Sequence, residues 1–363
     1  MRLGVNLLVL SANPPGGTGH YAVALFEAML RHPEVRNGHT TLIGFGREAG
    51  LRHLPEEARR HTRLLTGNRV WCEALGLPQA LRRERIDMLL NPAFLGPVYG
   101  SPHRAVVVHD LYFRSIPDMV PLRRRRMLSA LMPLMLRRSD PVITVSDATR
   151  AALMRFYPEA ADRTFTVRSA SRLAPQSGAG RAAMPVVRPA PFLLMIGHLT
   201  PNKDPEPVLA AMAMLRDRGR RVDLVHIGED FGRLAAAAAG HGLIGQVEAL
   251  GVRDDATLQA HYQACAATVV ASWEEGFGLP VLEAQELGAP VIASNCAALR
   301  EVGGEGALFF DMRDPSSCAT AIERVLDADR STLIAQGRAN AALYSWDRTA
   351  GAALDLLRGR IEA

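Results

Sequence analysis

Short apolar runs alternate with segments of helical periodicity along the whole chain. Apolar runs bounded by turn residues are typical of parallel strands that are buried on both faces. In the first half, such runs predict strands at residues 3–10, 41–45, 87–91, 105–108, 142–145 and 164–167. Helices are predicted between them at residues 18–31, 70–84, 120–138 and 148–156. This alternation predicts an α/β domain with a mainly parallel sheet.

A second series of the same kind begins after residues 169–191, which are rich in Ala, Pro, Gly, Ser and Arg and lack periodicity. Its strands are predicted at residues 192–196, 222–227, 247–250, 267–271, 291–293 and 307–310, and a helical pattern follows from Ser345. Because single cores seldom grow beyond about 250–300 residues, the 363 residues predict two domains. We predict a first domain at 1–170, a linker at 171–190, a second domain at 191–345 and a final helix at 346–363.

The residues SWEEGFGLPVLEAQELGAPVIASN, from Ser272 to Asn295, form the most informative stretch. An apolar run precedes two acids and a glycine-rich turn, and a helix is predicted from about Pro280 until Gly288, before another apolar run. This order predicts a strand, helix and strand unit. The turn Gly276-Phe277-Gly278 then presents backbone N–H groups at a helix N-terminus, which favours an anion such as a phosphate.

Two acids flank this predicted anion site. Glu275 is expected on the loop before the helix and Glu283 in its first turn, so both carboxylates can face the same crevice. A carboxylate accepts hydrogen bonds from two hydroxyls at once, which is what a ribose diol or a sugar offers. The stretch therefore predicts a site for a phosphorylated, hydroxyl-rich ligand.

The motifs EEGFGLPVLE, GAPVIAS and ALREVGGEGALFFDMRDP together resemble the donor site of retaining nucleotide-sugar glycosyltransferases of family 4. The resemblance covers most of the chain, and it is strongest at residues 190–314. It implies the α/β fold called GT-B, with two Rossmann-like domains whose parallel sheets face an interdomain cleft. It also implies that the final helix returns to the N-terminal, acceptor-binding domain.

The resemblance assigns roles to residues of the second domain. Glu275 would hold the hexose hydroxyls and Glu283 the ribose, while the N–H groups of Phe277, Gly278 and Leu279, after Gly276, would hold the diphosphate. The base would lie against the backbone near Val252. The reaction would be a retaining transfer of a hexose from a nucleotide sugar, without a metal ion, another cofactor or a carboxylate nucleophile.

Lys203 follows the predicted strand at 192–196 and is a compact cation suited to a departing diphosphate. A solvated loop lysine is the ordinary alternative, but Lys203 matches the resemblance. His198 stands where the family commonly has Arg. Either His198 shares the neutralisation of the diphosphate when protonated, or Lys203 and the helix N-terminus provide it.

Two features of the first domain are further candidates. Gly16, Gly17 and Gly19 follow the first predicted strand and allow a backbone to approach a phosphate, although a structural turn is an equal alternative. His109, in an HD motif at the end of a predicted strand, would be structural by itself. The resemblance implies that His109 contacts the donor sugar and polarises or positions it, which adds it to Glu275 and Lys203 as a catalytic candidate.

Other functions share parts of this pattern. A nicotinamide-dependent oxidoreductase also has two α/β halves, but the glycine loop lacks the dinucleotide fingerprint. A sugar-nucleotide epimerase or an inactive scaffold shares the GT-B fold, and the set of Glu275, Glu283 and Lys203 argues against a scaffold. We therefore expect a hexosyltransferase of polysaccharide or glycolipid assembly, with GDP-mannose as the first hypothesis for the donor and a saccharide or lipid-linked acceptor.

Composition changes this picture little. An apolar fraction of 48%, a charged fraction of 22% and a net charge of +5 are typical of a soluble globular protein, and no nucleic-acid module is recognised. No apolar run is long enough to span a bilayer, and the four scattered cysteines predict free thiols and a cytoplasmic location. The predicted helix at 121–138 combines arginines with apolar residues, so it is either a packed helix with a solvated basic end or a peripheral contact with the inner face of the cell membrane. The pair Asp327 and Asp329 is predicted to be surface charge.

Overall fold

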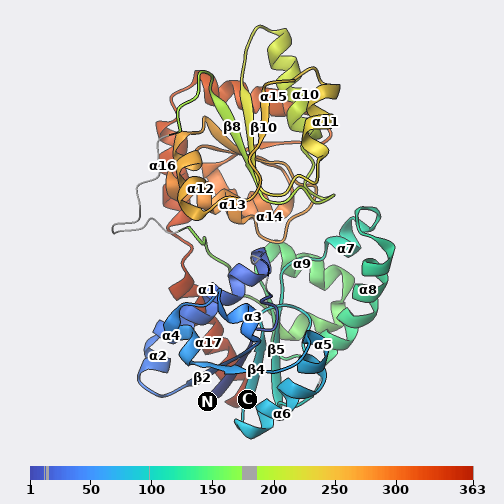
Figure 1. The fold of residues 1–363 in the computed structure, drawn as a ribbon, viewed down its shortest axis with the longest axis vertical. Coiled ribbons are helices and arrows are strands. Elements are labelled where there is room, and N and C mark those ends of the chain that lie inside the picture. Colours follow the sequence, from blue (N-terminus) through green and yellow to red (C-terminus); the bar gives the residue numbers. More distant parts are fainter. Residues whose placement is uncertain (12, 14–15, 98, 174–185, 363) are drawn as a thin grey trace. The chain divides into compact units, whose positions relative to one another are not determined.

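The computed structural model describes residues 1–11, 13, 16–97, 99–173 and 186–362. It divides into two compact units (Figure 1). Unit 1 comprises Met1–Ser115, Pro121–Ala170 and Tyr344–Ala363, and unit 2 comprises Ile116–Val120 and Ser171–Leu343. Most of the linker predicted at 171–190 lies outside the described residues. Each unit contains one sheet, so the α/β architecture is present twice.

The sheet of unit 1 has seven parallel strands in the order β3-β2-β1-β4-β5-β6-β7. The strands are β1 (Arg2–Asn6), β2 (Thr41–Gly46), β3 (Thr62–Leu64), β4 (Met88–Asn91), β5 (His103–Val108), β6 (Val142–Thr144) and β7 (Thr164–Thr166). The helices are α1 (Gly17–Arg31), α2 (Pro33–Arg36), α3 (Glu48–Leu51), α4 (Glu56–Arg60), α5 (Arg69–Trp71), α6 (Leu77–Arg83), α7 (Tyr112–Ser115), α8 (Leu122–Arg137), α9 (Asp147–Phe156) and α17 (Trp346–Glu362).

The first strand is shorter than predicted because a polar side chain ends it. The amide oxygen of Asn6 accepts a hydrogen bond from the Leu8 backbone at 3.1 Å, and its amide nitrogen donates to Asn91 Oδ1 at 3.0 Å. The chain therefore turns at Leu7, although Leu7, Leu8 and Leu10 are all buried. The apolar run at 3–10 therefore predicted correctly that these residues are buried, but it was wrong in predicting that the strand continues beyond Asn6.

The helix predicted at 70–84 is interrupted. It forms α5, a π-helical turn at Cys72–Gly76 and α6. Pro78 lies in the first turn of α6 and has no N–H to donate to the Ala74 carbonyl one turn earlier. The Tyr99 hydroxyl donates to that carbonyl instead. By contrast, α8 continues through Pro133.

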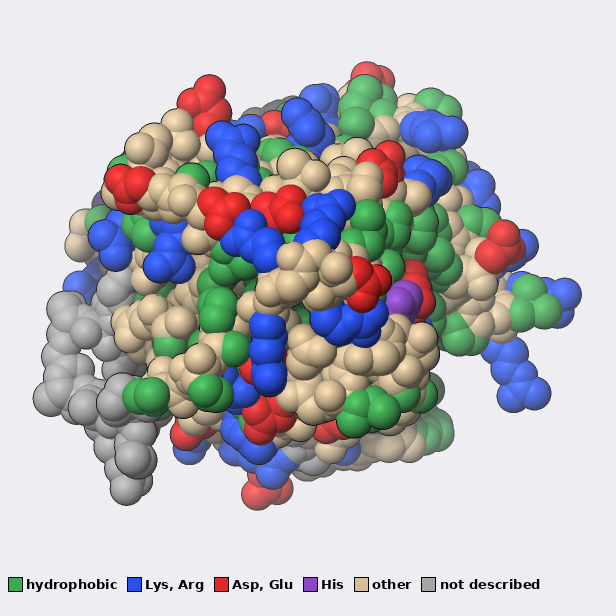
Figure 2. Space-filling view, turned by 90° about the horizontal axis from the view of Figure 1, so that it is seen from above, with side chains coloured by type: hydrophobic (Ala, Val, Ile, Leu, Met, Phe, Trp, Pro, Cys, Tyr) green, Lys and Arg blue, Asp and Glu red, His purple; other side chains and the backbone are tan. Residues whose placement is uncertain are grey.

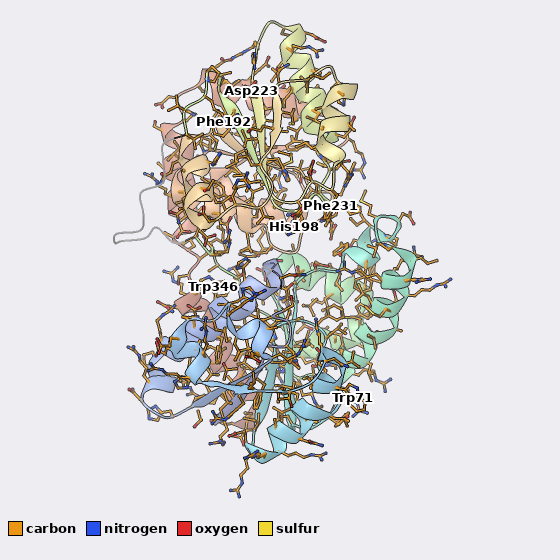
Figure 3. The ribbon with its side chains drawn as sticks, in the orientation of Figure 1. Trp71, Phe192, His198, Asp223, Phe231 and Trp346 are labelled. Carbon is orange, nitrogen blue, oxygen red and sulfur yellow. The ribbon has the colours of Figure 1, made fainter. Side chains whose placement is uncertain are left out.

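The last helix belongs to unit 1. α17 packs along α1 (Figure 1). The ring of Trp346 on α17, labelled in Figure 3, lies 5.4 Å from the ring of Tyr21 on α1, edge to face. The Thr349 hydroxyl also donates to the Arg168 carbonyl at 2.7 Å. These contacts attach α17 to unit 1, which also contains the first residues of the chain.

The sheet of unit 2 has six parallel strands in the order β10-β9-β8-β11-β12-β13. The strands are β8 (Phe192–Ile196), β9 (Asp223–Ile227), β10 (Val247–Ala249), β11 (Ala267–Val270), β12 (Val291–Ser294) and β13 (Leu308–Phe310), close to the predicted positions. The helices are α10 (Glu206–Asp217), α11 (Arg233–Gly240), α12 (Asp255–Ala264), α13 (Leu279–Leu287), α14 (Ala297–Gly303), α15 (Pro315–Asp327) and α16 (Ser331–Ala341). This strand order is that of a Rossmann-like sheet.

The distribution of charged side chains on the surface is consistent with the modest net charge. In the face shown in Figure 2, basic and acidic side chains are interspersed. The ion pairs Arg218–Glu323 and Arg220–Asp327 link the turn after α10 to α15. The four cysteines are free thiols, as predicted. Among the described residues, no helix is both long and apolar enough to cross a bilayer.

Candidate active site

The switch point of the unit 2 sheet lies between β8 and β11. These strands are neighbours, with Leu193 opposite Ala267, but the chain continues from β8 towards β9 and from β11 towards β12 on the other side. The loops that leave their carboxyl ends therefore separate, which is where open α/β sheets bind ligands. Those loops contain Lys203 and Glu275 respectively.

Backbone hydrogen bonds join the two loops. Lys203 forms an isolated antiparallel bridge with Ser272. On either side of it, the Trp273 N–H donates to the Asn202 carbonyl at 2.9 Å and the Asp204 N–H donates to the Ala271 carbonyl at 3.1 Å. These bonds set the register of one loop against the other. The positions of Lys203 and Glu275 therefore depend on backbone geometry more than on side-chain freedom.

Lys203 and Glu275 form an ion pair at this edge of the sheet. Lys203 Nζ lies 3.3 Å from Glu275 Oε1, and the Ser272 hydroxyl donates to the same oxygen at 2.9 Å. The side chains are 23% and 16% exposed, so both are shielded yet reachable. Gly197 has a φ of +105°, and a Cβ there would lie 3.2 Å from Lys203 Nζ. A side chain at Gly197 would crowd the ammonium group.

The N-terminus of α13 lies on the same loop as Glu275. Its N-cap, Gly278, has a φ of +107°, and no side chain of a described residue caps the helix. A Cβ at Gly278 would lie 2.5 Å from Leu299 Cδ2, in the buried interior of unit 2. The helix begins at Leu279 with Pro280 in its first turn and ends at Gly288, as predicted. Its dipole makes this end favourable for an anion.

Glu283 does not lie as predicted. Because α13 begins at Leu279, Glu283 is in the second turn, and its side chain is only 4% exposed. Tyr262 Oη donates to Glu283 Oε2 at 2.8 Å, and Arg172 Nε lies 3.4 Å from Oε1. Burial raises the pKa of Glu283, and the Arg172 guanidinium opposes that rise. The sequence marks neither residue as a partner of Glu283, since Tyr262 follows an ordinary helical pattern and Arg172 lies in the predicted linker.

His198 has a defined tautomer. Its Nδ1 accepts a hydrogen bond from the Glu229 N–H at 3.1 Å, so a neutral ring carries its proton on Nε2 and can donate from there. Next to it, the Phe231 ring lies 6.5 Å from the imidazole (Figure 3). Phe231 is 65% exposed and has a φ of +54°, which is rare for a bulky residue. Val252, after β10, is 47% exposed at the same edge of the sheet.

His109 lies in unit 1, directly after β5. Its Nε2 lies 2.7 Å from the Pro92 carbonyl, so Nε2 carries the proton and Nδ1 has a lone pair. The Tyr21 ring contacts the imidazole edge to face at 4.8 Å. Burial lowers the pKa of His109 to about 4, although the bond to Pro92 acts in the opposite direction. The ring is therefore neutral at pH 7.

The predicted glycine loop of unit 1 is mainly the start of a helix. Gly16 is the N-cap of α1, and Gly17 and Gly19 lie in its first turn. A Cβ at Gly16 or Gly17 would meet no other atom of the described residues within 4 Å. Pro14 and Pro15 lie outside the described residues.

The acidic pair predicted to be surface charge has structural partners. Asp327 pairs with Arg220, and Asp329 accepts hydrogen bonds from Ser331 at the start of α16. No group of three or more His, Cys, Asp or Glu side chains arranged to hold a metal ion occurs in the part of the chain that the structure describes.

Several known proteins are similar to this chain in sequence. The family described as "Glycosyl transferases group 1" matches residues 182–340. The O-antigen chain mannosyltransferase B of Escherichia coli is 31% identical over 69% of this chain and 70% of its own length. A D-inositol 3-phosphate glycosyltransferase of Geodermatophilus obscurus is 36% identical over 47% of this chain, and the match spans 41% of that relative.

Solved structures show the same fold over nearly the whole length. Sucrose-phosphate synthase from Thermosynechococcus elongatus has a TM-score of 0.77 at 20% identity, with 99% of each chain covered. Anabaena HepE in complex with UDP-glucose has a TM-score of 0.74 at 16% identity, covering 99% of this chain and 100% of HepE. Two Rossmann-like units of this kind make up the GT-B fold. The chain belongs to the group 1 glycosyl transferase family, as the motifs around Glu275 predicted.

Proposed function

We propose that this protein is a retaining hexosyltransferase of family 4 that uses a nucleotide-sugar donor, with GDP-mannose as the first candidate. The Escherichia coli relative, named as a mannosyltransferase, supports mannose as the hexose. Anabaena HepE was solved with UDP-glucose, which supports a nucleotide sugar as the class of donor. The side chain of Val252, exposed after β10, has no hydrogen-bonding group that would distinguish guanine from uracil, so the nucleobase is identified by the nucleotide screen below.

The observation that supports this function best is the Lys203–Glu275 pair at the switch point of unit 2. A diphosphate placed at the N-terminus of α13 would meet partial positive charge from the helix and a full charge from Lys203. His198 adds an N–H donor at Nε2, because its Nδ1 accepts from the Glu229 N–H. Glu275, on the loop that leads into α13, is then placed to accept hydrogen bonds from the hexose hydroxyls.

The mechanism follows from the charges that develop. The bond between the anomeric carbon and the diphosphate oxygen breaks, leaving positive character on the sugar and negative charge on the diphosphate. Lys203, His198 and the α13 N-terminus stabilise the diphosphate. The acceptor hydroxyl attacks the face that the diphosphate leaves, and its proton passes to a diphosphate oxygen. His109, being neutral with Nδ1 unprotonated, positions the hexose by accepting a hydrogen bond from one of its hydroxyls.

We propose that no metal ion is needed, because Lys203 and the α13 N-terminus neutralise the leaving group. Transfer measured in the presence of excess EDTA should match transfer measured without it. A loss of activity that added Mg²⁺ or Mn²⁺ restores would refute this part of the proposal.

We propose that the acceptor is a saccharide or a lipid-linked sugar, as in polysaccharide or glycolipid assembly. The name of the Escherichia coli relative supports an O-antigen type of product. α8 supports the lipid-linked form, because it presents exposed Leu122, Met127 and Leu134 beside the exposed residues Arg123, Arg124 and Arg126. Such a surface favours an anionic membrane on the cytoplasmic side. Sedimentation with vesicles of phosphatidylglycerol, but not of phosphatidylcholine alone, would support it.

The function can be tested in two stages. Thermal unfolding with GDP, UDP, ADP and dTDP identifies the donor class, since a ligand specific to the native state raises the melting temperature. The matching nucleotide sugars are then incubated with candidate acceptors, and the anomeric configuration of the product is determined by NMR. A product with inverted configuration would refute a retaining mechanism. An epimerised donor without transfer would show the alternative enzyme class, and stabilisation by NAD alone would indicate an oxidoreductase.

A further inference from the structure

The carboxylate of Glu283 is held from two sides inside unit 2. Tyr262 Oη donates to one oxygen at 2.8 Å, and Arg172 Nε lies 3.4 Å from the other. Each carboxylate oxygen has two lone pairs, so one acceptor position on each oxygen is left. With only 4% of the side chain exposed, few orientations of the carboxylate leave an oxygen that a ligand can reach. The direction in which the Glu283 carboxylate points therefore decides whether a ligand can reach one of its oxygens.

The two partners of Glu283 are themselves connected through α12. Arg172 donates through Nη1 to Asp255, which lies in the first turn of α12, and Tyr262 lies further along the same helix. Tyr262 is fully buried, and the Arg172 side chain is 21% exposed. Arg172 thus contacts the carboxylates of Asp255 and Glu283 through two different nitrogens. Because the guanidinium is planar and rigid, it fixes the positions of these two carboxylates relative to each other. The guanidinium of Arg172 and the carboxylate of Glu283 therefore connect α12, α13 and the segment at Arg172.

An enclosed carboxylate without these partners would be free to rotate and to lose its charge. Tyr262 is a hydrogen-bond donor to Glu283, and Arg172 is the positive charge beside it. Both residues contact Glu283, which lies one turn along α13 from the N-terminus proposed to bind the diphosphate. A group bonded to that diphosphate can therefore lie against Glu283, and in the proposed function that group is the nucleoside.

We propose that Arg172 and Tyr262 are positioning residues that set the orientation of the Glu283 carboxylate, so that its remaining lone pairs accept the hydroxyls of the donor ribose. This inference rests on the proposed function. It adds one requirement to that function. The preference for a ribose over a sugar that lacks the 2′ and 3′ hydroxyls must depend on Arg172 and Tyr262.

The test is a ratio of affinities. Calorimetric titration gives dissociation constants of the parent for GDP and UDP and for their 2′,3′-dideoxy counterparts. We expect the ribonucleotide to bind roughly tenfold or more tightly than its dideoxy form, as two hydrogen bonds to a charged acceptor imply. Arg172→Met and Tyr262→Phe should bring that ratio close to one, mainly by weakening the ribonucleotide. Arg172→Lys, which retains the charge, should retain part of the ratio.

A matched control separates positioning from general stability. Arg188 is also in unit 2, pairs with Glu248 and has a side chain 22% exposed, so Arg188→Met removes a similar ion pair away from α13. This variant should keep the parent ratio. Should Arg172→Met fail to fold, Tyr262→Phe still decides, because it removes one hydroxyl and leaves no charge unpaired.

The outcomes distinguish this inference from the function on which it rests. A parent that binds no nucleoside diphosphate overturns both. A parent that binds one but does not discriminate against its dideoxy form overturns the inference and leaves the function standing. A ratio that is unchanged in folded Tyr262→Phe and Arg172→Met overturns the inference as well. A ratio that rises in Arg172→Met would show that the guanidinium obstructs Glu283, which also contradicts positioning.

Discussion

Lys203 Nζ lies 3.3 Å from Glu275 Oε1, across the point where the unit 2 sheet reverses its winding. The two residues are far apart in sequence, and the bridge between Lys203 and Ser272 brings them together. The cation proposed for the leaving group and the carboxylate proposed for the sugar thus lie next to each other. This pairing is the geometric basis of the proposed transfer.

Glu275→Gln keeps the shape of the side chain but removes its negative charge, which pairs with Lys203 and is proposed to bind the sugar hydroxyls. We expect kcat to fall by about 100- to 1000-fold, with a smaller change in KM, because the interaction strengthens as the hexose gains positive character. Steady-state kinetics with the identified donor measure this. Glu323→Gln breaks the Arg218–Glu323 pair on the surface and should leave kcat unchanged. A Glu275→Gln enzyme with parental kcat would remove Glu275 from the mechanism.

The tautomer of His198 leads to a contrast between two substitutions. Asparagine can replace Nδ1 as the acceptor for the Glu229 N–H but offers no donor at the position of Nε2. Glutamine reaches the Nε2 position with an amide N–H. If His198 donates to the diphosphate, His198→Gln should bind nucleoside diphosphate within a few-fold of the parent, and His198→Asn should bind roughly tenfold more weakly. Equal dissociation constants for the two variants would contradict that role.

Gly278 should tolerate no side chain. Its φ of +107° disfavours any L residue, and a Cβ would lie 2.5 Å from buried Leu299. Gly278→Ala should cost about 2 kcal/mol or more of unfolding free energy, or a lower melting temperature by roughly 4–8 °C. At Gly240, the last residue of α11, φ is not positive and a methyl group would meet no other atom of the described chain within 4 Å. Gly240→Ala should therefore leave stability unchanged or raise it by about 0.4–1 kcal/mol. Equal melting temperatures for the two variants would argue against this geometry.

His109 should titrate far below an ordinary histidine. Its pKa of about 4 lies below the ordinary value of 6.5, so between these values the unfolded chain binds more protons than the folded protein. Stability from this group is complete above about pH 6.5 and is lost as the pH falls towards 4. NMR titration of the ring, assigned with a His109→Gln variant, measures the value directly. A midpoint near 6.5 would show that the ring is solvated and would remove the argument for a neutral hydrogen-bond acceptor.

Much of the fold follows from sequence because parallel strands are buried on both faces. The run at 192–196 predicted β8 at its observed bounds, and the strand, turn and helix around Gly278 follow from local chemistry. The run at 3–10 predicted too long a strand, since burial of Leu8 and Leu10 in a turn leaves the same apolar pattern. The short strand β3 at Thr62–Leu64 is mostly exposed and contains no apolar run.

The place of a candidate site residue was predictable where a local feature of the sequence, such as a strand end or a helix start, indicates it. Glu275 and the α13 N-terminus share one loop, and Lys203 follows a strand end, so position along the chain indicated their place. The surroundings of Glu283 depend on Tyr262, one helix earlier, and on Arg172, at the start of the predicted linker. Nothing local marks either residue as a partner, because their meeting is a result of tertiary packing.

The central claim is that the edge of unit 2 beside Lys203 binds the diphosphate of a nucleotide sugar. Calorimetric titration of the Lys203→Met variant with the nucleoside diphosphate that stabilises the parent tests it most directly, with Arg218→Met as the control for a lost surface charge. We predict that Lys203→Met weakens binding by about 10- to 100-fold, as loss of a charge-assisted bond implies, while Arg218→Met binds like the parent. Parental affinity in Lys203→Met would contradict the account.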